Sequence, residues 1–223
     1  RDGGTLDIAQ TALTVGAVAL GGSGTIETAT GSFDLQIQGK ADSPQTGISA
    51  VDRLLAGPVT AEGRITGGSG DGIGLDGLTL TSAALTASAS GHASAAAADL
   101  ALAVRLPDLA LVHEGLGGTA LIDAGLKGPW QGLTARIDGR GEAVTLMGKS
   151  LERPVAAAEV KIENAAPSGT FTASGRLDGK PVDIAASFAS DASGDVVLEN
   201  LTAIAGSARL SGKLRWPKGD APT

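Results

Sequence analysis

The stretch that decides the fold is TFTASGRLDGKPVDIAASFA, residues Thr170–Ala189. Phe171 lies between two threonines, and Ile184 lies between a polar and a small residue. Alternation of apolar and polar residues with a period of two is typical of a β-strand that has one wet face. The Asp178-Gly179 pair in the middle favours a two-residue turn. We therefore predict two antiparallel strands joined by a hairpin.

The same alternation recurs along the chain. Phe33, Leu35 and Ile37 alternate with polar residues, as do Val160 and Ile162. Further turn signals are Gly57-Pro58, Gly128-Pro129, Asp138-Gly139 and Asn164–Pro167. The pattern predicts a nearly all-β chain with at most one short helix, over Ile48–Leu55. The segment Ala93–Val104 is rich in alanine, but its second half alternates and is predicted as a strand.

A repeated LxxL pattern tests this prediction. It opens LDGLTLTSAALTASASG at Leu75 and LENLTAIAGSARLSG at Leu198, and it occurs in LPDLAL at Leu106. A helix over the first copy is disfavoured by its β-branched residues, glycines and serines. A leucine-rich repeat needs a regular period of about 20–29 residues, and these copies are irregularly spaced. We interpret LxxL as a tight bend at Asp76-Gly77 or Glu199-Asn200 that connects short strands.

Composition limits the possible functions. The chain has 223 residues, with 34 glycines, five aromatic residues, no cysteine and a net charge of −7. Few large side chains are available for a thick core, and the composition suits a thin layer covered by small aliphatic residues. The acidic balance, with basic residues scattered singly, argues against a nucleic-acid partner. The longest apolar run, residues 12–20, is about half the ~20 residues of a membrane-spanning helix.

No catalytic or metal-binding constellation is apparent. His92 and His113 have no paired-histidine spacing around them, so we predict neither a metal site nor a cofactor, and no enzymatic activity. The carboxylates are scattered over polar faces of the expected strands. Two glycine-rich segments, Gly67–Gly74 and Gly21–Ile26, lack the residues of a phosphate-binding loop or a calcium-binding repeat and are predicted as flexible loops.

Three segments together carry a resemblance to a known family: GGTALIDAGLKGPWQGLTARIDGRGEAVTL, AAAEVKIENAAPSGTFTASGRLDGKPVDIAASF and GDVVLENLTAIAGSARLSGKLRW. The spacing of glycines and apolar residues in these segments resembles that in the periplasmic portion of the TamB family. TamB proteins are inner-membrane components of the translocation and assembly module. TamB proteins belong to the wider AsmA-like group of bridge-like proteins. The likeness covers residues 60–216 well and the first sixty more loosely, and its patterns are degenerate.

The resemblance implies an elongated, curled antiparallel sheet, a half-pipe with a hydrophobic inner groove. It implies a place in the periplasm of a Gram-negative bacterium, with the full-length protein anchored in the inner membrane. Phospholipid would be the bound partner, moved between the two membranes. A TamA-like outer-membrane barrel would be a second partner, reached like the membranes through parts of the full-length chain outside this one. The family is also associated with outer-membrane protein assembly.

We expect residues 1–95 and 96–216 to form two parts of one β groove, and 217–223 to be a tail or linker. The candidate lipid-groove residues are the alternating apolar ones: Phe33, Leu35, Ile37, Leu75, Leu78, Leu80, Val160, Ile162, Phe171, Ile184, Phe188, Leu198 and Leu201. Two alternatives remain open. One is a scaffold that guides outer-membrane protein strands by β-augmentation. The other is a secreted β-solenoid adhesin.

Overall fold

A computed structural model describes residues 4–15, 18–47, 49–70, 72–163, 166–190 and 194–216. Strands dominate this part of the chain, as the alternation predicts. They are β1 (Thr5–Val15), β2 (Val18–Glu27), β3 (Ser32–Asp42), β4 (Pro58–Gly68), β5 (Gly72–Thr81), β6 (Thr86–Ala93), β7 (Ala97–Leu106), β8 (Leu116–Pro129), β9 (Gly132–Leu146), β10 (Lys149–Glu163), β11 (Ala166–Leu177), β12 (Lys180–Ser190), β13 (Val196–Ala205) and β14 (Ala208–Trp216).

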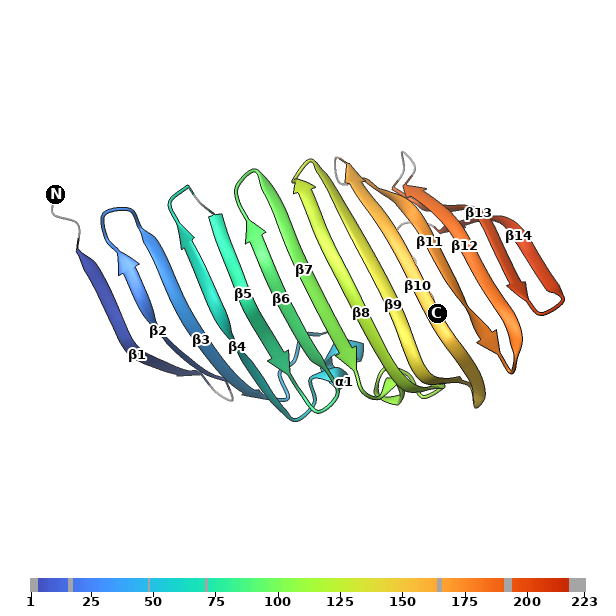
Figure 1. The fold of residues 1–223 in the computed structure, drawn as a ribbon, viewed down its shortest axis with the longest axis horizontal. Coiled ribbons are helices and arrows are strands. Elements are labelled where there is room, and N and C mark those ends of the chain that lie inside the picture. Colours follow the sequence, from blue (N-terminus) through green and yellow to red (C-terminus); the bar gives the residue numbers. More distant parts are fainter. Residues whose placement is uncertain are drawn as a thin grey trace.

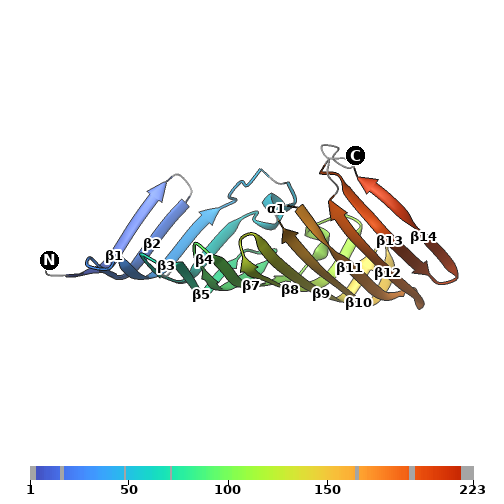
Figure 2. The same cartoon turned by 90° about the horizontal axis from the view of Figure 1, so that it is seen from above.

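The strands form a single antiparallel sheet in which each strand pairs with its neighbours in sequence, from β1 to β14 (Figure 1). Sequence order and spatial order are therefore the same. The sheet is elongated and curled, and it does not close into a barrel. Figure 2 shows that the strands rise from a common floor, so the layer is curved rather than flat. The expected boundary at residues 95 and 96 falls in the β6–β7 turn, and hydrogen bonding continues across it.

The hairpin at Thr170–Ala189 is confirmed. Leu177 pairs with Lys180, and the turn residues Asp178 and Gly179 have φ angles of 48° and 77°. Positive φ at both central residues matches the right-handed twist of the flanking strands. By contrast, Asp138-Gly139 is not a turn: both residues lie inside β9 and have partners in β8 and β10. The Asn164–Pro167 signal falls partly outside the described residues.

The interpretation of LxxL as a bend between strands is wrong in two of its three copies. Gly77 (φ 58°) and Asn200 (φ 52°) are bulge residues inside the continuous strands β5 and β13. The pairing register shifts between Leu75 and Leu78, and between Leu198 and Leu201. A bulge inserts an extra residue without ending the strand, so both leucines of each LxxL stay on the same face.

The glycine-rich segments are not flexible loops. Gly21–Ile26 lies within β2. In the second segment, Gly67 and Gly68 end β4 and Gly72–Gly74 begin β5, while Asp71 lies outside the described residues. Glycine is required in β2 because the neighbouring backbone approaches closely: a Cβ on Gly24 would lie 2.0 Å from the carbonyl oxygen of Asp34. The composition of these segments suggests a loop, but close strand packing explains it.

Two short helices interrupt the series of strands. The helix α1 (Ser49–Leu54) confirms the prediction over Ile48–Leu55, and a 3₁₀ turn, η1, covers Leu109–Leu111. They belong to the β3–β4 and β7–β8 connections, which lie at the same end of the strands (Figure 1). Here the structure has its cluster of buried residues, formed by Leu55, Val59, Leu85 and Leu106. None of the described helices is long and apolar enough to cross a bilayer.

Candidate apolar groove

The register of the sheet separates apolar from polar residues. Directly opposed residues on neighbouring strands point to the same face, and successive residues along a strand point to opposite faces. One row of opposed residues can be followed without a break through all 14 strands. It contains Ile8, Gly24, Leu35, Ile65, Leu75, Gly91, Leu100, Leu126, Ala135, Val160, Gly169, Phe188, Leu198 and Leu214. We call the face that carries this row the apolar face.

The next row along the strands belongs to the opposite face, which we call the polar face. Its members are Asp7, Thr25, Asp34, Thr66, Gly74, His92, Asp99, Lys127, Thr134, Lys161, Ser168, Ala189, Val197 and Arg215. Eleven of these fourteen residues are polar or charged, whereas the adjacent apolar row contains none.

All thirteen candidate groove residues lie on the apolar face. Phe33, Leu35 and Ile37 project from β3, and Leu75, Leu78 and Leu80 from β5. Val160, Ile162 and Phe171 project from β10 and β11, and Ile184, Phe188, Leu198 and Leu201 from β12 and β13. The sequence spacing places them on one face because the bulges at Gly77 and Asn200 restore the alternation. They are spread along the whole sheet and do not gather into one pocket.

Large side chains of the apolar face lie over glycines on neighbouring strands. A Cβ on Gly67 would be 2.6 Å from Cζ of Phe33, and a Cβ on Gly169 would be 3.0 Å from Cζ of Phe188. Leu20 covers Gly39 in the same way, with its Cδ2 at 3.2 Å. At these places the apolar face, which forms the floor of the groove, pairs a large side chain with a glycine on the next strand. This pairing keeps the layer thin.

Much of this apolar face is open. Among the described residues, fifteen large apolar ones are exposed, with Leu13 at 59% and Leu210 at 62%. Eleven of them lie on the apolar face: Leu6, Leu13, Val18, Leu20, Ile73, Leu102, Ile137, Leu146, Phe171, Leu210 and Leu214. An exposed apolar surface that is contiguous, rather than scattered, marks a binding site.

The apolar face is hollowed between β8 and β12. A hollow of about 420 Å³ is lined there by Ile122, Val144, Leu151, Leu177 and Ile184, and also by Leu109 of η1. This volume lies within the range of about 300–1,000 Å³ that is usual for ligand pockets. Ile184 is the only member of the predicted set in this hollow. Sequence reasoning missed Leu151 and Leu177 because they flank turns, where the alternation is short.

The polar face also has a depression, of about 560 Å³, because a twisted sheet is saddle-shaped. Asp138, Arg140, Thr172, Ser174 and Asp183 line it. These side chains come from adjacent strands and are open to solvent, so they do not form an enclosed site. Within the described residues, no group of three or more His, Asp or Glu side chains could hold a metal ion.

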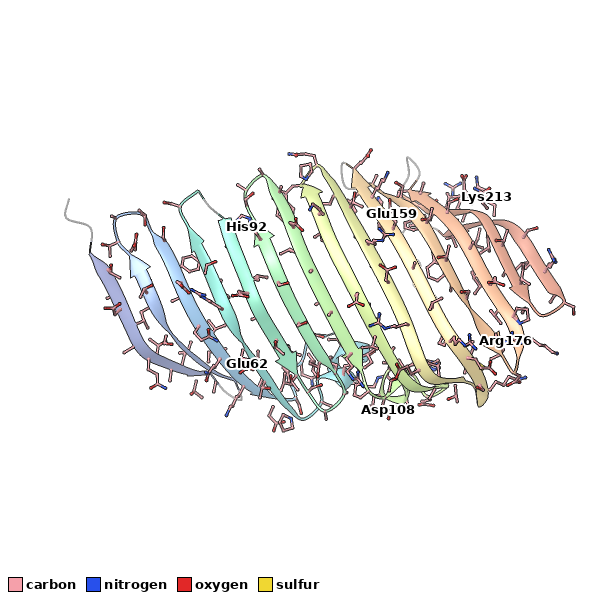
Figure 3. The ribbon with its side chains drawn as sticks, viewed as in Figure 1. Glu62, His92, Asp108, Glu159, Arg176 and Lys213 are labelled. Atoms are coloured by element: carbon pink, nitrogen blue, oxygen red, sulfur yellow. The ribbon has the colours of Figure 1, made fainter. Side chains whose placement is uncertain are left out.

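Ion pairs cross between strands on the polar face. Arg64 Nε donates to Asp34 Oδ1 at 2.6 Å, and Lys127 Nζ lies 2.8 Å from Asp99 Oδ2. The Arg64 guanidinium holds the pKa of Asp34 below its usual value, and the Asp99 carboxylate raises the pKa of Lys127. Figure 3 shows such polar side chains along the sheet, among them Glu62, Glu159, Arg176 and Lys213. Because both partners are exposed, each ion pair contributes little to stability. Together, the charged side chains keep the polar face solvated.

Comparisons with protein-family models, with curated proteins and with solved structures find no match to this chain.

Proposed function

We propose that this chain is a non-enzymatic section of a periplasmic bridge, and that its apolar face shelters phospholipid acyl chains on their way between the inner and outer membranes. The observation that carries the proposal is the unbroken apolar row from Ile8 to Leu214. An acyl chain requires a continuous dry surface, and each methylene removed from water contributes roughly 0.8 kcal/mol.

The chemistry of the face supports a hydrocarbon ligand over a polar one. Among the residues that line the 420 Å³ hollow, aliphatic side chains dominate, and the one charged residue, Arg140, belongs to a row of the polar face. A ligand with several hydrogen-bonding groups would leave them unpaired there, at a cost. The headgroup of a phospholipid would stay outside, at the open side of the groove.

A uniform floor also supports movement along the groove. Leucine, isoleucine, valine and alanine recur from strand to strand without a specific polar anchor on the row. No position along such a surface binds an acyl chain much more tightly than the next, so a bound chain can slide. The periplasmic location and the direction between two membranes rest on the resemblance to the TamB family.

Photocrosslinking tests the proposal with a matched pair on one strand. A photoreactive amino acid at Phe171 or Ile137, both exposed on the apolar face, should capture phospholipid from mixed vesicles. The control is Thr172, which follows Phe171 on β11 but lies on the polar face. Equal capture at Phe171 and Thr172, or capture at neither, would sink the proposal.

One observation favours the β-augmentation scaffold as a second candidate. Within the described residues, β1 and β14 are the first and last strands of the sheet, which is where an incoming strand would add. Photoreactive residues in these edge strands would then capture polypeptide rather than lipid. The β-solenoid alternative does not fit, because its coils require parallel strands and every pair in this sheet is antiparallel.

A further inference from the structure

Two connections differ from all others in the sheet. The β3–β4 connection spans residues 43–57 and the β7–β8 connection spans 107–115, whereas the other connections between strands have two to five residues. These two connections meet over the intervening β5–β6 hairpin, at one end of the strands (Figure 1). We call the pair, with α1 and η1, the clasp.

The clasp lies on the apolar face. Val51 and Leu54 of α1 and Leu109 of η1 pack against the buried cluster, together with Leu80, Val104 and Ile122 of the floor. Leu80, Val104 and Ile122 belong to the apolar face by register. Figure 2 shows α1 on the side toward which the strands rise. The clasp therefore covers a section of the surface that is open elsewhere.

Few polar contacts hold the clasp in place. Arg53 Nη2 donates to the carbonyl oxygen of Val112 at 2.9 Å and so joins the two connections. Ser82 Oγ donates to the carbonyl oxygen of Leu54 at 2.6 Å and ties α1 to the β5–β6 turn. Met147 N also donates to the carbonyl oxygen of Gly115 at 2.6 Å, at the end of the β7–β8 connection. Between these hydrogen bonds, the described apolar residues of the clasp rest on the floor, which is the same surface that an acyl chain would use.

We infer that the clasp is a lid that competes with the acyl chain for the floor of the groove. In the structure it covers the apolar face of β5–β8 near one end of the strands, over Leu80, Val104 and Ile122, whereas Leu102 of β7 is 43% exposed. Leu109 of the clasp also lines the 420 Å³ hollow. An acyl chain reaches this covered part of the floor only when the clasp is lifted. This inference rests on the proposed function for the identity of the ligand, but not for the position of the lid.

The base of the longer connection permits a clean deletion. Ser43 N donates to the carbonyl oxygen of Gly57 at 2.8 Å, and Gly57 N donates to Ser43 Oγ at 3.0 Å. Both residues have positive φ angles, 47° for Ser43 and 79° for Gly57. Positive φ at both central residues is what a two-residue hairpin of type I′ requires. Removal of residues 44–56 should thus leave a Ser43-Gly57 turn between β3 and β4.

Two readouts test the lid in the full chain, one of which needs no lipid. The dye 8-anilinonaphthalene-1-sulfonate reports exposed apolar surface, and deletion of 44–56 should increase the amount of dye bound. Phospholipid capture by photoreactive residues at Leu80 and Val104 should rise several-fold to the level found at Ile137. Val51→Asp keeps the connection intact but removes the apolar contact of α1, and should act in the same direction. Gln38→Ala, on the polar face of β3, is the control.

The outcomes separate the two proposals. Unchanged dye binding in both the deletion and Val51→Asp, with circular dichroism showing an intact sheet, overturns the lid even if Ile137 captures lipid. Increased dye binding without lipid capture anywhere leaves the lid in place and contradicts the proposed function. Capture at Leu80 and Val104 that already equals capture at Ile137 in the unaltered chain also overturns the lid.

Discussion

At the residue scale, the absence of side chains is as important as their chemistry. Gly24 has a φ of 152°, and a Cβ there would lie 2.0 Å from the carbonyl oxygen of Asp34. Gly212 on β14 has open space around the same position and no positive φ. The two glycines therefore differ in what they contribute: the first allows two strands to approach, and the second only adds chain entropy.

This difference predicts opposite effects of the same substitution. Gly24→Ala should lower the free energy of unfolding by about 1–3 kcal/mol, because it introduces backbone strain and a steric clash. Gly212→Ala should be neutral or should stabilise by about 0.4–1 kcal/mol, through the entropy of the unfolded chain. Urea unfolding followed by circular dichroism measures both. Equal destabilisation by both changes would contradict the assignment of Gly24 to a close strand contact.

At the element scale, the sequence predicts strands and their faces better than it predicts where strands bend. Phe171 and Ile184 were placed on one face by alternation alone, and the register agrees. The LxxL copies and Gly21–Ile26 were misinterpreted because bulge residues and strand glycines have the same composition as turns. Only the pairing partner distinguishes them, and a partner such as Asp34 for Thr25 is not visible in one strand's sequence.

The clasp could be predicted only in part, for a related reason. The helix over Ile48–Leu55 follows from local pattern, but its position on the apolar face depends on Leu85 and Leu106, which are remote in sequence. The residues of the hollow near η1 were missed for the same cause. Local periodicity indicates which face of each strand is apolar, whereas the curvature and the covering of that face depend on long-range contacts.

The loop before α1 makes the clasp sensitive to acid. Asp52 Oδ1 accepts hydrogen bonds from Thr46 N at 2.6 Å and from Thr46 Oγ1 at 2.7 Å, and these bonds lower the pKa of Asp52 below 3.8. A carboxyl group with a depressed folded-state pKa stabilises the fold fully above its unfolded value, and this contribution is lost as pH falls through the folded value.

We expect Asp52→Asn to loosen the clasp and to increase dye binding at neutral pH. As the pH falls below 3.8, the unaltered chain should approach the dye binding of the variant, because its Asp52 becomes protonated. Asp34→Asn is the matched control: it removes a carboxylate of lowered pKa that lies on the polar face, so dye binding should stay unchanged. A pH-independent gap between the Asp52→Asn variant and the unaltered chain would contradict this role of Asp52.

At the scale of the whole molecule, the sheet has neighbour contacts but almost no core. Each strand packs mainly on the strands beside it, and the described residues that are buried and apolar are few and mostly small or near the clasp. Such an arrangement resembles a repeat protein, in which stability is a sum of local units and neighbour interfaces. Stability should therefore vary along the sheet and not be shared by all strands.

Local destabilisation should consequently stay local. Leu106→Ala removes a buried side chain at the centre of the molecule and should cost about 2–5 kcal/mol where it packs. Amide hydrogen exchange measured by mass spectrometry should speed up in β6–β8 and in the clasp, while β1, β2, β13 and β14 keep their rates. Leu102→Ala on the same strand, where the side chain is exposed, should leave the pattern almost unchanged. Uniform acceleration of all strands by Leu106→Ala would show instead that the sheet unfolds as one cooperative unit, because the loss of one central contact would then reach both distant edges.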